Sequence, residues 1–249
     1  MILCVDVGNT ATKMALVAGE RVVRRGVIDA DAGERAAARL LARVVRGSRR
    51  LETAVLSSVR PQATDAMVRV VVRATGLYPI VVNHRTPMPI EIAVRYPGRV
   101  GTDRLCAACG AMRGRRRDAI VITVGSAITV NLIRDRVFVG GVIMPGPATS
   151  LAALHAFTAK LPALGIDAPA PARIDDTESA MRWGALLAGA GGIRLAVEML
   201  DRQARSHPAR IVTGGDSTRI QRWLPSGWSM DPDLTVLGMA RIARTDSAK

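Results

Sequence analysis

Polar side chains follow directly on the first apolar stretch of the sequence, in the segment Asp6-Val7-Gly8-Asn9-Thr10-Ala11-Thr12-Lys13. Gly8 lets the backbone turn sharply and approach a ligand closely. Asn9 and Thr10 supply amide and hydroxyl donors, Lys13 a positive charge, and Asp6 a carboxylate that can hold Mg²⁺ directly or through water. These are the parts needed to hold the phosphates of a nucleotide. An ordinary Asx-type hairpin turn uses the same residue types, and that interpretation stays open.

A second candidate is the segment Gly101-Thr102-Asp103-Arg104, which opens a predicted helix. Asp103 could accept a proton from a substrate hydroxyl, and Arg104 could bind an anionic group. The helix dipole alone also favours an acid in a first turn. Thr177 is similarly ambiguous, because it is a natural N-cap for the long helix that follows it.

Glycine pairs stand at the ends of two predicted strands, at Gly140-Gly141 and Gly214-Gly215. Either pair can simply form a turn. At a nucleotide site such pairs also let a flat base or ribose pack against the backbone, because no Cβ intervenes.

The sequence pattern of the first strand and turn is repeated in the second half of the chain. Ala119-Ile120-Val121-Ile122-Thr123-Val124-Gly125-Ser126 repeats the pattern of residues 2–9, with Thr123 in the place of Asp6 at an offset of 117. The same offset aligns Thr12 with Thr129. The repeat predicts two related domains, residues 1–117 and 118–249, unless two Val/Ile-rich strands coincide by chance.

The patterns in both halves of the sequence predict α/β structure. Three hairpin-type strands followed by alternating helices and strands predict a pair of stacked α/β domains with a cleft between them. In the first predicted helix, Ala38, Leu41 and Val45 fall on one face. After the opening strands of residues 2–7 and 12–17, strands are expected over residues 21–28, 53–59, 78–83, 119–124, 127–133, 136–142 and 210–213. Helices are expected over 34–45, 61–73, 102–112, 150–159, 178–203 and 234–242.

The composition bounds the possible partners. Of the 249 residues, 35 are basic and 21 acidic, a net charge of +14 that permits binding of nucleic acid or of anionic substrates such as nucleotides. Two Phe, two Tyr and three Trp are too few for the base-stacking platforms of single-strand binders, so nucleic acid is not expected as a partner. An arginine-rich composition on solvated faces is the simpler account of the charge.

Membrane, metal and redox functions have little support in the sequence. No apolar run approaches the roughly 18 residues of a membrane span, and the N-terminus does not resemble a signal peptide, so a soluble cytoplasmic protein is expected. Cys106-Ala107-Ala108-Cys109 is a lone CxxC, with only Cys4 besides. Small apolar cysteines inside a helix explain it better than a zinc or redox site.

Together these motifs resemble the type III pantothenate kinases, of the superfamily that includes acetate kinase, sugar kinases and actin. The resemblance covers nearly the whole chain. Its motifs, in order, are Asp6 to Thr10, Ser57 to Pro61, Val100 to Arg104, the turn at Gly125, Gly140 to Gly146, Thr177 to Ala180, and Thr213 to Gly215. It implies two ribonuclease H-like domains with an interdomain nucleotide cleft. It further implies ATP-dependent phosphorylation of pantothenate, the first step of coenzyme A synthesis, in a cytoplasmic homodimer.

The resemblance also assigns roles. Asp103 would be the general base, Asp6 would handle Mg²⁺, and Thr177 would contact pantothenate. The remaining pantothenate contacts would be Gly101, Thr102 and Arg104. The remaining ATP contacts would be Gly8, Asn9, Thr10, Lys13, Gly125, Ser126, Gly214 and Gly215.

Three positions depart from the family pattern. The second turn of the family begins with an aspartate that serves a monovalent cation (K⁺ or NH₄⁺), and here the residue is the neutral Thr123. A later aspartate is Asn131. The family's substrate tyrosine, three residues before a proline, is Val94, while Tyr96 stands next to Pro97. These departures leave two further hypotheses: a catalytically impaired relative that acts as a nucleotide-binding regulatory or accessory protein, and a kinase with another acceptor.

Overall fold

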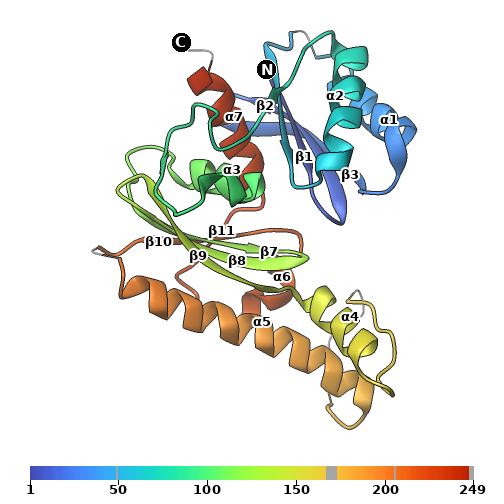
Figure 1. The fold of residues 1–249 in the computed structure, drawn as a ribbon, viewed down its shortest axis with the longest axis vertical. Coiled ribbons are helices and arrows are strands. Elements are labelled where there is room, and N and C mark those ends of the chain that lie inside the picture. Colours follow the sequence, from blue (N-terminus) through green and yellow to red (C-terminus); the bar gives the residue numbers. More distant parts are fainter. Residues whose placement is uncertain (49, 167–172, 205, 247–249) are drawn as a thin grey trace. The chain divides into compact units, whose positions relative to one another are not determined.

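A computed structural model describes residues 1–48, 50–166, 173–204 and 206–246, and it divides the chain into two compact units (Figure 1). Unit 1 comprises Met1–Arg117, Asp135–Val139 and the C-terminal segment from Asp233. Unit 2 comprises Asp118–Arg134 and Gly140–Pro232. Unit 1 is therefore discontinuous in sequence, because two later segments return to it.

The sheet of unit 1 has the strand order β3-β2-β1-β4-β5. The first three strands pair antiparallel, and β4 and β5 continue the sheet in parallel. The strands are β1 (Ile2–Val7), β2 (Ala11–Ala18), β3 (Arg21–Asp29), β4 (Thr53–Ser58) and β5 (Ile80–Val81). The helices of unit 1 are α1 (Gly33–Val45), α2 (Pro61–Thr75), α3 (Thr102–Ala111) and α7 (Leu234–Asp246), with the short 3-10 helix η1 (Pro97–Arg99).

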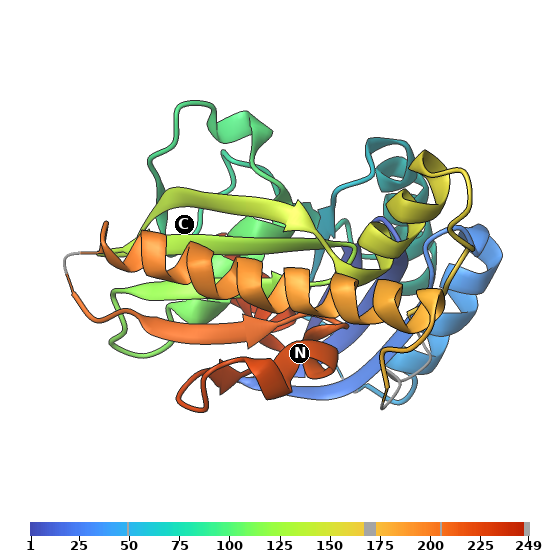
Figure 2. The same cartoon turned by 90° about the horizontal axis from the view of Figure 1, so that it is seen from below.

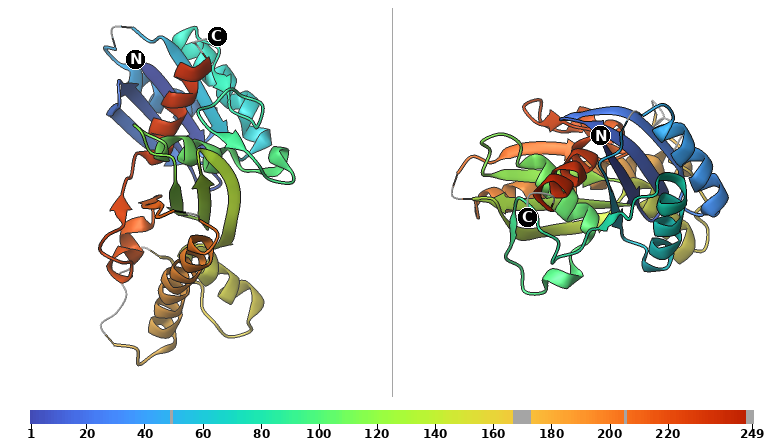
Figure 3. Two further views of the ribbon diagram at one scale, coloured as in Figure 1. Left: turned by 90° about the vertical axis from the view of Figure 1, so that its left-hand side faces the viewer. Right: turned by 90° about the horizontal axis from the view of Figure 1, so that it is seen from above.

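Alternation along β1 distributes its side chains between two helical layers. Leu3, Val5 and Val7 join one buried core with residues of α1 and α2. Cys4 faces the other side, where its Sγ lies 3.6 Å from the backbone oxygen of Val236 in α7. Because successive side chains of a strand point to opposite faces, Asp6 lies on the same face as Cys4, the face that α3 and α7 cover. Figure 3 shows α7 against the strands of unit 1 and beside α3.

Two glycines allow α3 and α7 to cross in direct backbone contact. A Cβ on Gly238 would lie 1.8 Å from the oxygen of Cys106, and a Cβ on Gly110 would lie 2.0 Å from the oxygen of Leu234. No side chain fits at either position without moving a helix.

Cys106 and Cys109 are buried in α3, as predicted for small apolar residues inside a helix. Burial raises the pKa of Cys109 to about 12 and that of Cys106 well above its usual value. Both are therefore protonated thiols at neutral pH, a poor state for redox or metal chemistry.

Unit 2 repeats the opening of unit 1. Its sheet runs β11-β10-β7-β8-β9, and β7 and β8 form an antiparallel hairpin like that of β1 and β2. Strand β9 starts within unit 1, where β6 (Glu91–Ile92) pairs with Val137 and Phe138. The strands of unit 2 are β7 (Ala119–Val124), β8 (Ala127–Arg134), β9 (Val137–Pro145), β10 (Ala209–Thr213) and β11 (Ser229–Met230). Its helices are α4 (Pro147–Phe157), α5 (Thr177–Asp201) and α6 (Ser217–Ile220), with the 3-10 helix η2 (Gln221–Trp223).

Helix α5 lies along the sheet of unit 2, as Figure 2 shows. Gly189 faces the sheet, where a Cβ would meet the Cδ1 of Ile128 at 3.1 Å. An 18-residue stretch of α5 has a mean hydropathy of 1.2, so by length and composition this helix could cross a membrane. In the structure, 44% of that stretch is buried inside the protein. Core helices of soluble proteins have the same properties, so this single helix is weak evidence for a membrane.

The predicted α/β class and the duplicated strand order are confirmed, with differences at particular elements. The predicted buried face of α1 is wrong in part, because Ala37, Leu40 and Val44 are buried and Ala38 is exposed. The strand expected over residues 78–83 is reduced to Ile80 and Val81. Helix α4 begins at Pro147 rather than Ser150, since proline suits a first helical turn.

Candidate active site

Asp6 lies between Lys13 and Ser57 in the sheet of unit 1. It faces Lys13 across the antiparallel pair β1–β2 and Ser57 across the parallel pair β1–β4. Burial raises the pKa of Asp6 to about 6 against the opposing charge of Lys13, and the charge of Asp103 adds to the rise. The two aspartates therefore share one electrostatic environment, as a single site requires.

Hydroxyl groups fix the start of α3 to the end of β4. Thr102 Oγ1 donates to the backbone oxygen of Ser58 at 3.1 Å and lies 3.1 Å from Ser57 Oγ. Since Ser57 neighbours Asp6, these contacts bring Asp103, the next residue of α3, to the end of β1 where Asp6 lies.

The carboxyl group of Asp103 is held in a partly desolvated position. Burial raises its pKa, while the backbone N–H and the guanidinium of Arg104 oppose the rise. A Cβ on Gly101 would lie 2.5 Å from Asp103 Oδ1, so a side chain at this position would displace the carboxyl group of Asp103. A carboxylate with a raised pKa binds a proton more readily than an exposed one, as a general base should.

Arg104 brings a positive charge next to Asp103. Its guanidinium carbon lies 5.4 Å from the centre of the Phe138 ring, and burial lowers its pKa. Phe138 was not singled out in the sequence, because it is far from Arg104 along the chain and only the pairing of β6 with β9 brings it there.

The first predicted phosphate turn is a tight connection between β1 and β2. The N–H of Gly8 donates to the oxygen of Ala11 at 3.0 Å, and a Cβ on Gly8 would lie only 3.0 Å from that oxygen. Asn9 and Thr10 form its exposed tip. The turn presents these two residues to a ligand while Asp6 stays at the end of β1.

In unit 2, three glycine-containing segments meet at the end of β7. Gly214 has a φ of +103°, and a Cβ on it would lie 2.1 Å from the oxygen of Val124. A Cβ on Gly146 would lie 1.8 Å from the oxygen of Gly125, and the N–H of Gly146 donates to the oxygen of Ser126 at 2.9 Å. The predicted residues Gly125, Ser126, Gly214 and Gly215 thus belong to one cluster of backbone turns.

Thr123 stands in β7 where Asp6 stands in β1. Its neighbours across the sheet are Thr129 in β8 and Thr213 in β10, in the places of Lys13 and Ser57. The offset of 117 holds only up to the turn, so the predicted match of Thr12 with Thr129 is wrong. In the structure, Thr129 stands in the place of Lys13. That turn has two residues in unit 2 and three in unit 1.

The row of polar residues across the sheet of unit 2, Thr129, Thr123 and Thr213, carries no charge. Among the described residues, no hydrogen-bond partner reaches the buried Oγ1 of Thr123. Asn131 is fully buried and its Nδ2 donates to Thr129 Oγ1 at 3.0 Å. Within the same part of the chain, no group of three His, Cys, Asp or Glu side chains could hold a metal ion. The side-chain donors at Thr123 are therefore uncharged hydroxyls, without the carboxylate that the family pattern has at this position.

Thr177 does not cap α5, contrary to the interpretation from sequence. The N-cap is Asp176, whose carboxylate accepts from the N–H of Ser179 at 2.8 Å and from its hydroxyl at 2.6 Å. Aspartate is among the best N-cap residues, which explains the shift by one position. Thr177 is the exposed first residue of α5.

Tyr96 is half-exposed between two arginines of its own loop. The guanidinium carbons of Arg95 and Arg99 lie 5.2 and 4.9 Å from its ring centre. These cation–π contacts give Tyr96 a role in holding the loop before α3.

Comparisons with known proteins agree on one family. A sequence model of the type III pantothenate kinase family matches residues 2–199. The type III pantothenate kinase of Caulobacter vibrioides is 30% identical over 256 residues, covering 99% of this chain and 98% of that protein. The enzyme of the same name from Phenylobacterium zucineum is 32% identical over 259 residues, covering 100% of both.

Solved structures agree on the fold. A ROK family glucokinase from Streptomyces griseus, in complex with glucose and AMPPNP, matches with a TM-score of 0.58 at 14% identity, covering 100% of this chain and 99% of that one. The ethanolamine utilization protein EutJ from Carboxydothermus hydrogenoformans matches with a TM-score of 0.58 at 17% identity, covering 96% and 89%. The duplicated α/β architecture is thus shared with sugar kinases.

Proposed function

The chain belongs to the type III pantothenate kinase family, and on that premise we propose how its residues transfer the terminal phosphoryl group of ATP to pantothenate. This reaction is the first step of coenzyme A synthesis. The observation that supports the proposal is the anchoring of the start of α3 beside Asp6, since Thr102 Oγ1 lies 3.1 Å from Ser57 Oγ and the charge of Asp103 adds to the raised pKa of Asp6.

Asp103 acts as the general base. As the phosphoryl group leaves ATP, the primary hydroxyl of pantothenate attacks it and passes its proton to the Asp103 carboxylate. The raised pKa of Asp103 supports this role, because it strengthens the carboxylate as a proton acceptor. Most of the remaining catalysis is positioning and charge neutralisation.

Asp6 and the β1–β2 turn handle the phosphates of ATP. The oxygen donor set at Asp6 suits Mg²⁺, which commonly uses one or two carboxylates together with phosphates and waters. When bound, the ion supplies neutralisation of the phosphate charge. Lys13 adds a positive charge opposite Asp6, and Gly8, Asn9 and Thr10 offer backbone and side-chain donors. In unit 2, Gly125, Ser126, Gly214 and Gly215 offer backbone to the rest of the nucleotide.

Arg104 binds the carboxylate of pantothenate, and Gly101, Thr102 and Thr177 contribute further contacts. Support comes from the position of Arg104 beside Asp103, with its guanidinium fixed over Phe138. A fixed cation at this place would orient the substrate so that its hydroxyl reaches Asp103.

Catalysis proceeds without a monovalent cation. The resemblance to the family implies K⁺ or NH₄⁺ at the position of Thr123, but the row Thr129–Thr123–Thr213 offers only neutral hydroxyls. Without a carboxylate, this row offers no negative charge to attract K⁺ or NH₄⁺. No step of the reaction therefore depends on such an ion.

The chain acts as a cytoplasmic homodimer. Support for self-association comes from α5, where Leu187, Leu195 and Met199 are 47%, 59% and 49% exposed along one face. Gly191 lies between them, so two copies of this face could approach closely. The face also carries Arg194 and Glu198, and Glu198 forms an ion pair with Arg202 at 2.9 Å.

The experiment is an ATP-coupled assay with pantothenate, using the wild-type chain and the Asp103→Asn variant. Turnover by the wild type and its loss in the variant are expected. Folded wild-type protein that binds ATP without turnover would favour the regulatory or accessory alternative. Transfer to other hydroxy acids or sugars, and not to pantothenate, would reveal another acceptor.

A further inference from the structure

A cavity of about 490 Å³ opens in unit 1 at the amino ends of β1 and β4. Ile2 and Thr53, neighbours across these parallel strands, line it together with the segment before β4 and the last turns of α7. Asp6 lies four residues along β1 from Ile2, about 13 Å at 3.3 Å per residue. The cavity is therefore separate from the site of Asp6 and Asp103.

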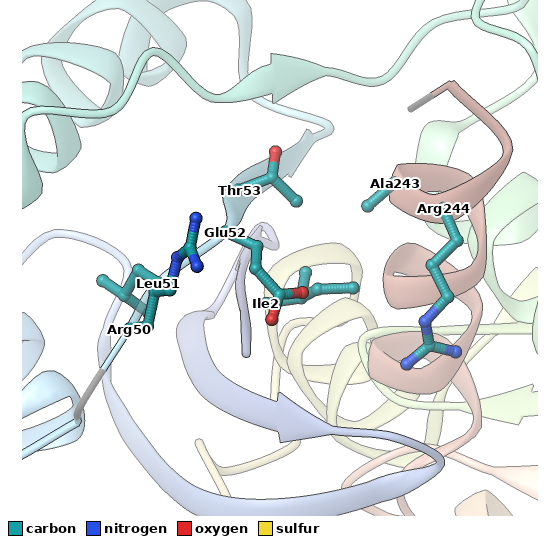
Figure 4. A pocket seen from close by; sticks show the side chains of 7 residues that line it. All are labelled: Ile2, Arg50, Leu51, Glu52, Thr53, Ala243 and Arg244. Atoms are coloured by element: carbon teal, nitrogen blue, oxygen red, sulfur yellow. The ribbon is translucent and has the colours of Figure 1, made fainter. Parts of the chain in front are cut away.

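Two arginines face this cavity from opposite sides. Figure 4 shows Arg50 and Arg244 on either side of Ile2, Glu52 and Thr53. Glu52 is the one acidic residue of the lining, and its Oε1 lies 2.8 Å from the ammonium group of Met1. In the part of the chain that the structure describes, no carboxylate forms an ion pair with Arg50 or Arg244. The ammonium group of Met1 lowers the pKa of Glu52, Arg50 and Arg244 add to this effect, and Arg244 also donates to the backbone oxygen of Gly19. Three cationic groups thus stand against one carboxylate, and the lining keeps a net positive charge.

The floor of the cavity is apolar. Leu51 is partly buried and Ile2 is exposed only at its edge, while Ala243 lies fully buried beneath them. The volume falls within the roughly 300–1,000 Å³ of small-molecule sites, which combine an apolar lining with a few polar groups. Guanidinium groups pair well with phosphate because of their planar array of donors.

From this arrangement we propose that the cavity binds a small organic phosphate. The phosphate group lies between Arg50 and Arg244, and the apolar part of the ligand lies on Leu51 and the exposed edge of Ile2. The hydroxyl of Thr53 is available to a phosphate oxygen. This site is independent of the proposed kinase site, so its ligand does not compete with ATP.

Titration with phenyl phosphate tests the proposal, in the presence of a saturating non-hydrolysable ATP analogue that occupies the kinase site. Calorimetry compares wild type, Arg50→Gln, Arg244→Gln and a control, Arg39→Gln, at an exposed position of α1. Binding to wild type and control is expected, with a loss of at least about tenfold in the two cavity variants, since charge-assisted pairs are strong. Inorganic phosphate, which lacks an apolar part, should bind more weakly.

A soak of wild-type crystals with tungstate locates the anion, and an anomalous peak between Arg50 and Arg244 is expected. The proposal is overturned if phenyl phosphate does not bind, if the two cavity variants bind it as well as the control, or if no peak lies between the two arginines. Equal affinity for inorganic and phenyl phosphate would overturn the role given to the apolar floor. None of these outcomes depends on kinase activity.

Discussion

Thr123 in β7 is the structural counterpart of Asp6 in β1, each flanked in register by the matching residues of its two neighbouring strands. The same three-strand frame thus carries a charged row in unit 1 and a hydroxyl row in unit 2. Only one of the two copies has a carboxylate for metal and phosphate chemistry.

Replacement of Asp103 by asparagine should lower kcat by about 10²–10⁴-fold, the usual contribution of a general base. ATP binding should persist, because the substitution keeps the size of the side chain and leaves in place the contacts of Thr102 that anchor α3. Single-turnover kinetics and nucleotide titration check the two effects separately. Equal activity of variant and wild type would show that another group takes the proton.

Asp6→Asn should stabilise the fold at pH 8 while it lowers activity. The folded-state pKa of about 6 lies above the ordinary 3.8, so ionisation of Asp6 costs stability as pH rises through this window. The neutral variant avoids that cost, a gain of about 1–3 kcal/mol at pH 8. Denaturant unfolding measures it, and the gain should vanish near pH 4, where Asp6 is largely protonated in the folded state. A pH-independent difference would mean that burial is not its cause.

Wild-type turnover should be the same in potassium, ammonium, sodium and choline salts at equal ionic strength. Thr123→Asp should make turnover several-fold higher in potassium than in choline, because a carboxylate in the row of Thr129 and Thr213 attracts a cation. Thr129→Ser, which keeps the row neutral, is the matched control. Strong stimulation of the wild type by potassium would contradict the neutral-row interpretation.

Gly238→Ala should destabilise unit 1 by about 1–3 kcal/mol, as overpacking does. Its new Cβ would overlap the backbone oxygen of Cys106. Gly184→Ala in α5 is the control, because nothing lies within 4 Å of its Cβ position. There the higher helix propensity of alanine should raise stability by about 0.5–1 kcal/mol. Thermal and denaturant unfolding of both variants checks that stability falls in Gly238→Ala and rises in Gly184→Ala.

Leu195→Glu should convert the proposed dimer to a monomer, since it places a charge in the exposed apolar face of α5. Val27→Glu, at a residue 57% exposed on β3, is the control and should leave the dimer intact. Sedimentation velocity distinguishes the two states. A wild-type chain that stays monomeric at high concentration would rule out this face as a dimer contact.

Sequence reasoning captured the features that depend on local patterns. The repeat of residues 2–9 predicted the duplicated hairpins. Polar residues at the end of the first strand and at the start of a predicted helix pointed to Asp6 and Asp103, whose roles stay predictions. It missed what depends on register and long-range packing. The register of β8 follows from a turn one residue shorter, Phe138 reaches Arg104 through a distant strand pair, and Asp176 competes with Thr177 for the N-cap.

The return of α7 to unit 1 has a consequence for biosynthesis. Because α7 covers the face of the sheet that carries Cys4, the first unit lacks one of its layers until the last helix has been translated. Most of unit 2 lies in the sequence between the first part of unit 1 and α7. At ordinary rates of chain elongation, its translation delays the completion of unit 1 by about 10 s. During that interval the nascent first half exposes an apolar surface that a chaperone could recognise.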